Sequence, residues 1–207
     1  MLQPVKTSNL RRASMLCVAP RLWRLSSLVA VVLGFHVLAR AADMSADCGA
    51  SALPEQVRRF LHEEFANWTI QEPRHLSSEA RATWAARRPL ECPGVATGRF
   101  DDINESAYAF LLVSIDPQKS AFKLVVCAAS KGQPYRARVV EQWDGGGAEN
   151  YFIRKISISS AFGAEWIKKL RAQATDGILL VDSAATEYEA DMYFWSNDKY
   201  KHEPIDR

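Results

Sequence analysis

The sequence of 207 residues lacks the features that identify several large classes of protein. It has no internal repeat at the period of a solenoid or propeller. Its longest apolar stretch, residues 28–39, is well short of the roughly 20 residues that a helix needs to span a bilayer. It also lacks the Gly-x-Ser-x-Gly motif of a serine hydrolase, and His62 has no second histidine at zinc-protease spacing. With 48% hydrophobic residues, the chain is nevertheless rich enough in apolar side chains to fold.

The first 41 residues have the three parts of a secretory signal peptide. They contain six Lys or Arg residues and no acid, and the apolar stretch 28–39 ends in Ala39-Arg40-Ala41, with small residues at the positions that a signal peptidase reads. We therefore expect residues 1–41 to be a signal peptide and residues 42–207 to form a single domain that is secreted or periplasmic, with no stable membrane span after cleavage. The alternative is an uncleaved N-terminal anchor.

The chain also lacks an excess of positive charge once the leader is removed. The remaining chain has 20 basic and 24 acidic residues, a net charge of −4, and its basic pairs are isolated from one another. Because nucleic acid requires a basic surface, we expect no nucleic-acid partner. We expect another protein as the partner.

Cysteine is scarce, with three residues outside the leader: Cys48, Cys92 and Cys127. In an oxidising compartment this number predicts one disulfide and one leftover thiol. Cys127 ends the apolar run 124–127, which suits a buried free thiol, so the pairing Cys48–Cys92 is favoured over Cys92–Cys127. No histidine supplies the fourth ligand that zinc would need, and we expect no cofactor.

Two helices are predicted before the strands. Residues 54–68 begin with Pro54 and carry one apolar stripe at helical spacing, formed by Val57, Phe60, Leu61, Phe65 and Trp68. A second helix is predicted over 78–87, capped by Ser78 and ended by Pro89. The segment 164–173 is ambiguous and suits a short helix.

After residue 94 the pattern becomes typical of strands. Apolar, β-branched and aromatic runs alternate with short turn sequences at residues 107–115, 121–129, 135–143, 151–158, 177–182, 186–195 and 200–205. Because the connections are short, they favour hairpins over helical crossovers. The sequence therefore predicts an α+β fold, with N-terminal helices packed on a mainly antiparallel β-sheet of about six or seven strands.

One segment resembles a known family. Gly98-x-Phe100-Asp101, then a loop, then the run 108–112 resembles the loop of an FG-GAP repeat, in which a Gly-Asp-Phe-Asp-Gly-Asp-Gly run binds calcium before a strand. The match covers one short segment, and Arg99 replaces the leading acid. The resemblance implies a structural module with a degenerate calcium-type loop, whose ligands would be Asp101, Asp102, Asn104 and Glu105; we favour no metal. The segment also resembles short exported bacterial proteins of unassigned function, which implies a compartment more than an activity.

An acidic strand face supplies the candidate binding residues. The alternation over residues 186–195 predicts a strand with one face toward solvent. The candidate residues are three acids and the aromatic residues expected near them, namely Glu187, Glu189, Asp191, Trp143, Tyr193 and Trp195. Such a face would suit a basic cleft on a partner.

These features predict a non-enzymatic binding or inhibitory protein of the cell envelope, in one version an immunity or inhibitor protein against a toxin or lytic enzyme. Two alternatives stay open at this point. One is an envelope hydrolase, since carboxylates at i and i+2 lie on one side of a strand and could serve glycoside chemistry. The other is the structural module with a degenerate calcium-type loop. No catalytic residue is assigned.

Overall fold

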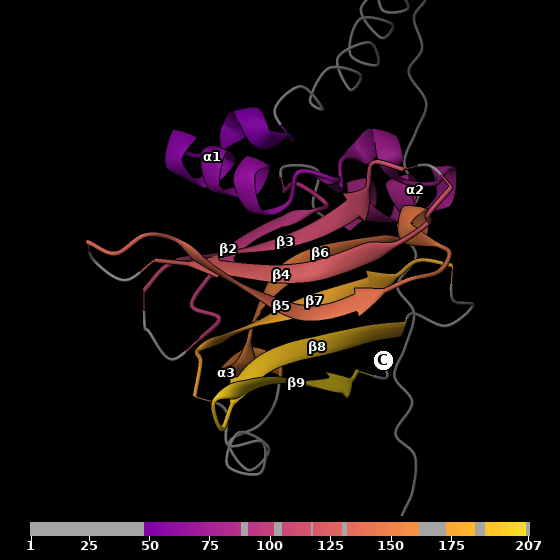
Figure 1. Ribbon diagram of the computed structural model, residues 1–207. Coiled ribbons are helices and arrows are strands. Elements are labelled where there is room, and N and C mark those ends of the chain that lie inside the picture. Colours follow the sequence, from indigo (N-terminus) through magenta and orange to yellow (C-terminus); the bar gives the residue numbers. More distant parts are fainter. Residues whose placement is uncertain are drawn as a thin grey trace, which may run out of the picture. The chain divides into compact units, whose positions relative to one another are not determined.

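The structure is a computed structural model that describes residues 48–87, 91–101, 105–116, 118–129, 132–161, 173–184 and 189–205. All of them belong to the second of two compact units of the chain, Ala42–Arg207. This part of the chain combines helices with antiparallel sheets, which confirms the expected mixture of the two (Figure 1). Within the described ranges, no helix is both long and apolar enough to cross a bilayer.

The described chain forms three α-helices and nine strands in two sheets. The helices are α1 (Glu55–Glu64), α2 (Ser78–Arg87) and α3 (Ile158–Ala161), and short 3₁₀ turns occupy Ala50–Ala52, Pro73–His75 and Ala148–Asn150. The strands are β1 (Trp68–Ile70), β2 (Val95–Gly98), β3 (Ala107–Ser114), β4 (Phe122–Ala128), β5 (Arg136–Trp143), β6 (Tyr151–Ser157), β7 (Asp176–Asp182), β8 (Glu189–Ser196) and β9 (Lys199–Pro204). The expected single sheet of six or seven strands is therefore wrong in number and arrangement. Most of the segment 164–173 lies outside the described residues.

The first sheet contains β1 to β5, and its edge on one side is shared by two short strands. β1 pairs with one half of β3 and β2 pairs with the other half, both antiparallel. They meet at Leu111, whose carbonyl accepts a hydrogen bond from Gln71 N at 2.8 Å and whose N–H donates to Gly94 O at 3.0 Å. A side chain on Gly94 would overlap the backbone of Gln71, so only glycine allows the two short strands to lie end to end.

The second sheet is an antiparallel meander of β6, β7, β8 and β9. Its last turn is formed by Asn197 and Asp198, both with positive φ (51° and 61°), as the tight turn of a β-hairpin requires. The expected hairpin between β5 and β6 is wrong, since these strands lie in different sheets. Between them Gly147, with φ of 86°, leads into a 3₁₀ turn that carries the chain from one sheet to the other.

The two main helices pack on different sheets and not together on one face. Val57 and Leu61 of α1 pack on the outer face of the first sheet, against Phe110 and Leu112. On the second sheet, the cluster that contains α2 side chains also contains Leu179, Met192 and Phe194. A third cluster fills the space between the sheets, with Leu111, Leu124, Ile153, Ile178 and Tyr193 among its members. Strands such as β3 are therefore apolar on both faces.

The first helix is shorter than its apolar stripe predicts. It ends at Glu64, and Phe65, the residue after it, has non-helical backbone angles. Trp68 N donates to Phe65 O at 2.9 Å, which turns the chain into β1. The stripe continues across this turn because Phe65 and Trp68 still pack toward the same apolar cluster as α1.

The cysteines pair as the sequence favours. Cys48 and Cys92 form a disulfide, with Cα atoms 5.0 Å apart. Cys127 is a buried free thiol in β4, and its burial raises the pKa of the thiol to about 12. A thiol held protonated in this way is inert as a nucleophile.

Hydrogen bonds to the backbone join the two sheets where β2 lies beside β6 and the start of β7. Ile153 N donates to Pro93 O at 2.7 Å, and Asp176 N donates to Arg99 O at 3.1 Å. The fully buried Gln71 adds an amide bridge, since its Nε2 donates to the carbonyls of Ala148 and Tyr151 at 2.7 and 3.1 Å. We call this side of the molecule the joined edge and define it by Gln71, Pro93, Arg99, Ile153 and Asp176.

Candidate functional site

At the opposite edges of the two sheets, β5 lies against the β8–β9 hairpin through side chains. The contacts are an edge-on pair of aromatic rings, a phenol–carboxylate hydrogen bond and a guanidinium over an indole. We call this region the open edge and define it by Arg138, Glu141, Trp143, Tyr193, Trp195 and His202. Within the described strands, β5 has a hydrogen-bonded neighbour on only one side.

A bulge in β5 determines which of its side chains face the second sheet. Val139 lies opposite Val125, whereas Glu141 lies opposite the preceding residue, Leu124, so Val140 is an extra residue in β5. Because a bulge reverses the alternation of side chains beyond it, Arg138 before the bulge and Glu141 after it share one face. Without the bulge, the carboxylate would point away from β8.

The central contact of the open edge is a hydrogen bond between β8 and β5. Tyr193 Oη donates to Glu141 Oε2 at 2.6 Å, and His202 Nδ1 lies 4.0 Å from the same oxygen. Tyr193 is 3% exposed, and its burial together with this carboxylate raises the pKa of the phenol. Tyr193 therefore acts as a hydrogen-bond donor that fixes Glu141 and not as a base.

Aromatic rings form a rigid base for the open edge. Trp143 stacks on Phe122, with ring centroids 4.4 Å apart, and meets Tyr193 edge-on at 6.5 Å. Trp195 meets Tyr200 edge-on at 5.1 Å, and the guanidinium carbon of Arg138 lies 4.3 Å from the centre of the Trp195 ring. Stacked rings and a stacked guanidinium have few accessible rotamers, so the surface is preorganised.

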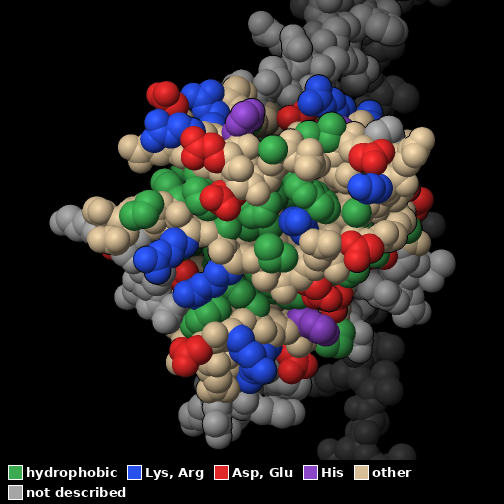
Figure 2. Space-filling view, in the orientation of Figure 1, with side chains coloured by type: hydrophobic (Ala, Val, Ile, Leu, Met, Phe, Trp, Pro, Cys, Tyr) green, Lys and Arg blue, Asp and Glu red, His purple; other side chains and the backbone are tan. Residues whose placement is uncertain are grey.

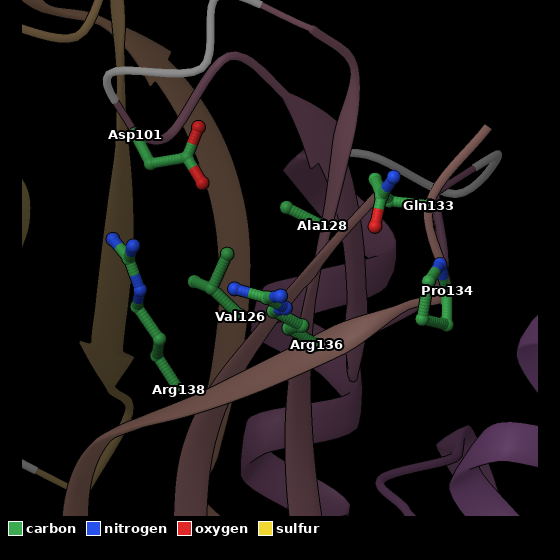
Figure 3. A pocket seen from close by; sticks show the side chains of 7 residues that line it. All are labelled: Asp101, Val126, Ala128, Gln133, Pro134, Arg136 and Arg138. Carbon is green, nitrogen blue, oxygen red and sulfur yellow. The ribbon is translucent and has the colours of Figure 1, made fainter. Parts of the chain in front are cut away.

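Arg138 forms part of the wall of two cavities. The smaller, about 250 Å³, is lined by Asp101, Arg136 and Arg138 together with parts of β4 and the β4–β5 turn. Figure 3 shows Arg138 extending toward Asp101 on one side of this cavity, with Gln133 and Pro134 on the other. The larger, about 520 Å³, lies between β5 and the β8–β9 turn and includes Trp195 and Lys199.

The described surface near these cavities mixes basic and apolar side chains. Arg136, Arg138 and Lys199 are exposed, and Val139 is 52% exposed although it is apolar. Figure 2 shows blue Lys and Arg groups beside green apolar surface on the face in view.

The structure brings together three of the aromatic and acidic residues predicted as a site. Trp143 and Tyr193 are in contact, while Trp195 lies under Arg138. The expected solvent-facing side of β8 is wrong, because Tyr193 and Trp195 are 3% and 4% exposed and Asp191 is half-buried. β5 covers this side, which the sequence of β8 alone could not reveal. Glu187 lies outside the described residues, as does the side chain of Glu189.

The acidic loop does not gather its predicted ligands within the described chain. Asp101 is 3% exposed and lines a cavity with two arginines, whose charge opposes a cation. Glu105 is exposed, while Asp102 and Asn104 lie outside the described residues. No cluster of three metal-ligating side chains is present among the residues that the structure describes.

Sequence reasoning missed Arg138, Glu141 and His202. His202 lies in β9, in the predicted strand 200–205, and pairs with Tyr193. The consecutive residues Val139 and Val140 interrupt the alternation of β5, and this interruption is the signal that could have indicated a bulge and a changed face for Glu141.

Comparisons with known proteins assign no family. The chain matches no protein-family model, no curated protein and no solved structure. The resemblance to FG-GAP loops and to exported proteins therefore stays a prediction, and the function has to be argued from the site.

Proposed function

We propose that this protein is a non-enzymatic binding protein that recognises another protein through its open edge. The observation that carries the proposal is Val139, an apolar side chain that is 52% exposed on an edge strand and directly follows Arg138 of the open edge. An edge strand offers backbone donors and acceptors to a partner, and an exposed apolar residue on it adds contact area.

The composition of the open edge supports binding. Tryptophan and arginine are among the residues that contribute most to protein–protein affinity, and here Trp143 and Arg138 are each held in place by stacking on an aromatic ring. A partner would meet a surface that loses little conformational entropy on binding.

The charge of this surface favours an acidic partner surface. Arg136, Arg138 and Lys199 line the two cavities, and Asp101 and Asp198 lie beside them. The sequence predicted an acidic ridge that meets a basic cleft. With basic side chains outnumbering acidic ones at the cavities, the proposal instead pairs the open edge with acidic groups on the partner.

We further propose that the protein acts outside the cytosol, as an inhibitor or immunity protein of the envelope. The signal-like leader and the Cys48–Cys92 disulfide support export, since disulfides persist in oxidising compartments. The hydrolase alternative needs carboxylates in a cavity, and Asp191 does not line the cavities described above.

Site-specific crosslinking in the producing cells tests the proposed function. A photoreactive phenylalanine analogue is placed at Val139 and, as the matched control, at Ile115, an apolar residue that is 58% exposed beyond β3. We expect a discrete protein adduct at position 139, its loss in the Arg138→Glu variant, and no adduct at position 115. No adduct at 139, or equal adducts at both positions, would contradict the proposal.

A further inference from the structure

The larger cavity of the open edge combines two cationic side chains with a buried indole donor that has no acceptor in the part of the chain that the structure describes. We propose that this cavity binds a carboxylate group of the partner, with Arg138, Lys199 and the indole N–H of Trp195 as its donors. The inference rests on the proposed function, because it names the chemical group that the open edge would recognise.

The two cations are held at the cavity by different means. Arg138 is positioned by stacking on Trp195, with its guanidinium carbon 4.3 Å from the centre of the ring. Lys199 follows directly after the tight turn of Asn197 and Asp198, and Asp198 and Lys199 both line the cavity. An anion placed between the two strands would therefore meet positive charge from both sides.

The indole of Trp195 is the independent observation. Its side chain is 4% exposed, and Nε1 is buried without a hydrogen-bond partner among the described residues. A buried donor without an acceptor costs about 1–3 kcal/mol, so such groups are rare unless a ligand satisfies them. Trp195 also lines the cavity, so an acceptor that enters there comes close to this ring.

The neighbouring groups favour a carboxylate over a phosphate. Asp198 lines the same cavity and would repel a dianion more strongly than a monoanion. Val139, Val140 and the Trp195 ring supply an apolar wall, which suits the carbon atoms that accompany a carboxylate at a chain terminus or in an acidic side chain.

The test follows the indole N–H resonance of Trp195 in the ¹⁵N-labelled full chain, identified by its loss in Trp195→Phe. Four probes are titrated: a short apolar peptide with a free C-terminal carboxylate, the same peptide amidated, an amidated peptide with one internal Glu, and inorganic phosphate. We expect a saturable shift with the carboxylate peptides and none with the fully amidated peptide. Arg138→Gln or Lys199→Gln should weaken binding about tenfold, whereas the matched control Lys119→Gln should not.

Each outcome decides the inference. A shift with the free C-terminus alone identifies a chain end as the ligand, and a shift with the Glu peptide alone identifies an acidic side chain. A stronger response to phosphate, or no response to any probe, overturns the inference. Crosslinking at Val139 does not require a carboxylate on the partner. Adducts at Val139 without peptide binding would therefore support the proposed function and overturn only the inference that the cavity binds a carboxylate.

Discussion

The joined edge and the open edge connect the same two sheets by different means. At the joined edge, backbone groups of Pro93, Ile153 and Asp176 bond across the sheets, and the buried amide of Gln71 bridges them. At the open edge, the connection runs through side chains such as Glu141 and Tyr193. Backbone bonds fix the relative position of the sheets whatever the side chains are, whereas a side-chain edge is free to carry recognition.

This difference separates stability from function along the two edges. Buried backbone hydrogen bonds are costly to lose, because the groups left behind cannot reach water. Exposed side chains at the open edge, such as Arg138, can be exchanged at little cost to folding. Changes at the joined edge should therefore lower the free energy of unfolding, and changes at the open edge should alter binding.

The largest expected effect is the loss of the disulfide beside the joined edge. Cys92 precedes Pro93, and the bond to Cys48 closes a loop of 44 residues. Replacing both cysteines by serine should lower the free energy of unfolding by about 4 kcal/mol, mainly because the unfolded chain gains freedom. Urea unfolding of oxidised wild type and variant measures the difference, and an unchanged midpoint would mean that the joined edge does not depend on this bond.

The second effect concerns the close approach of the two short edge strands. Gly94→Val should cost about 3 kcal/mol, because its side chain would overlap the backbone of Gln71 and separate β1 from β2. Gly145→Ala is the matched control, since nothing lies within 4 Å of that position, and it should change stability by less than about 0.5 kcal/mol. Equal losses of stability in the two variants would contradict the close approach of Gly94 to the backbone of Gln71.

The third effect isolates the amide bridge. Gln71→Ala removes the hydrogen bonds to Ala148 and Tyr151 and leaves their partly buried carbonyls without this donor, so it should cost about 2 kcal/mol. Thermal unfolding of the variant gives the value. A loss of unfolding free energy below about 0.5 kcal/mol, as for a typical surface substitution, would show that the amide bridge does not stabilise the joined edge.

The smallest effect on stability is expected at the open edge. Tyr193→Phe removes the hydrogen bond to Glu141 and should cost about 1 kcal/mol at neutral pH. Folding raises the pKa of Tyr193, so its contribution is complete below about pH 10, the pKa of an unfolded tyrosine, and is lost as the pH rises further.

Urea unfolding midpoints of the wild type and of Tyr193→Phe, measured over a series of pH values, check this prediction. Above pH 10, the free energy of unfolding should fall less steeply with pH in Tyr193→Phe than in the wild type. Both proteins should share the loss of stability that comes from the buried Cys127 thiol, whose pKa is raised to about 12. Parallel curves for the two proteins would show that ionisation of the Tyr193 phenol is not linked to folding.

The sequence predicts the local elements well where packing is simple. β3 and β4 follow from continuous apolar runs between turn residues, and the cysteine pairing follows from the apolar surroundings of Cys127. The division into two sheets could not be predicted, because it depends on how the loop at Gly147 directs β6 away from β5.

The candidate site was only partly predictable for a similar reason. Tyr193 and Trp195 were recognised by residue type, but the cover over them comes from β5, which is distant in the sequence. Glu141 faces them because of a bulge, and alternation alone assigns it to the wrong face.

Native-state hydrogen exchange compares the two edges most directly. We predict that the amides of Gln71 and Ile153, at the joined edge, exchange only through global unfolding, whereas amides of β5 exchange through local opening at a lower free energy. The slope of each amide's opening free energy against denaturant concentration distinguishes global unfolding from local opening. Protection of β5 equal to that of Ile153 would contradict the claim that one edge holds the fold together while the other is available to a partner.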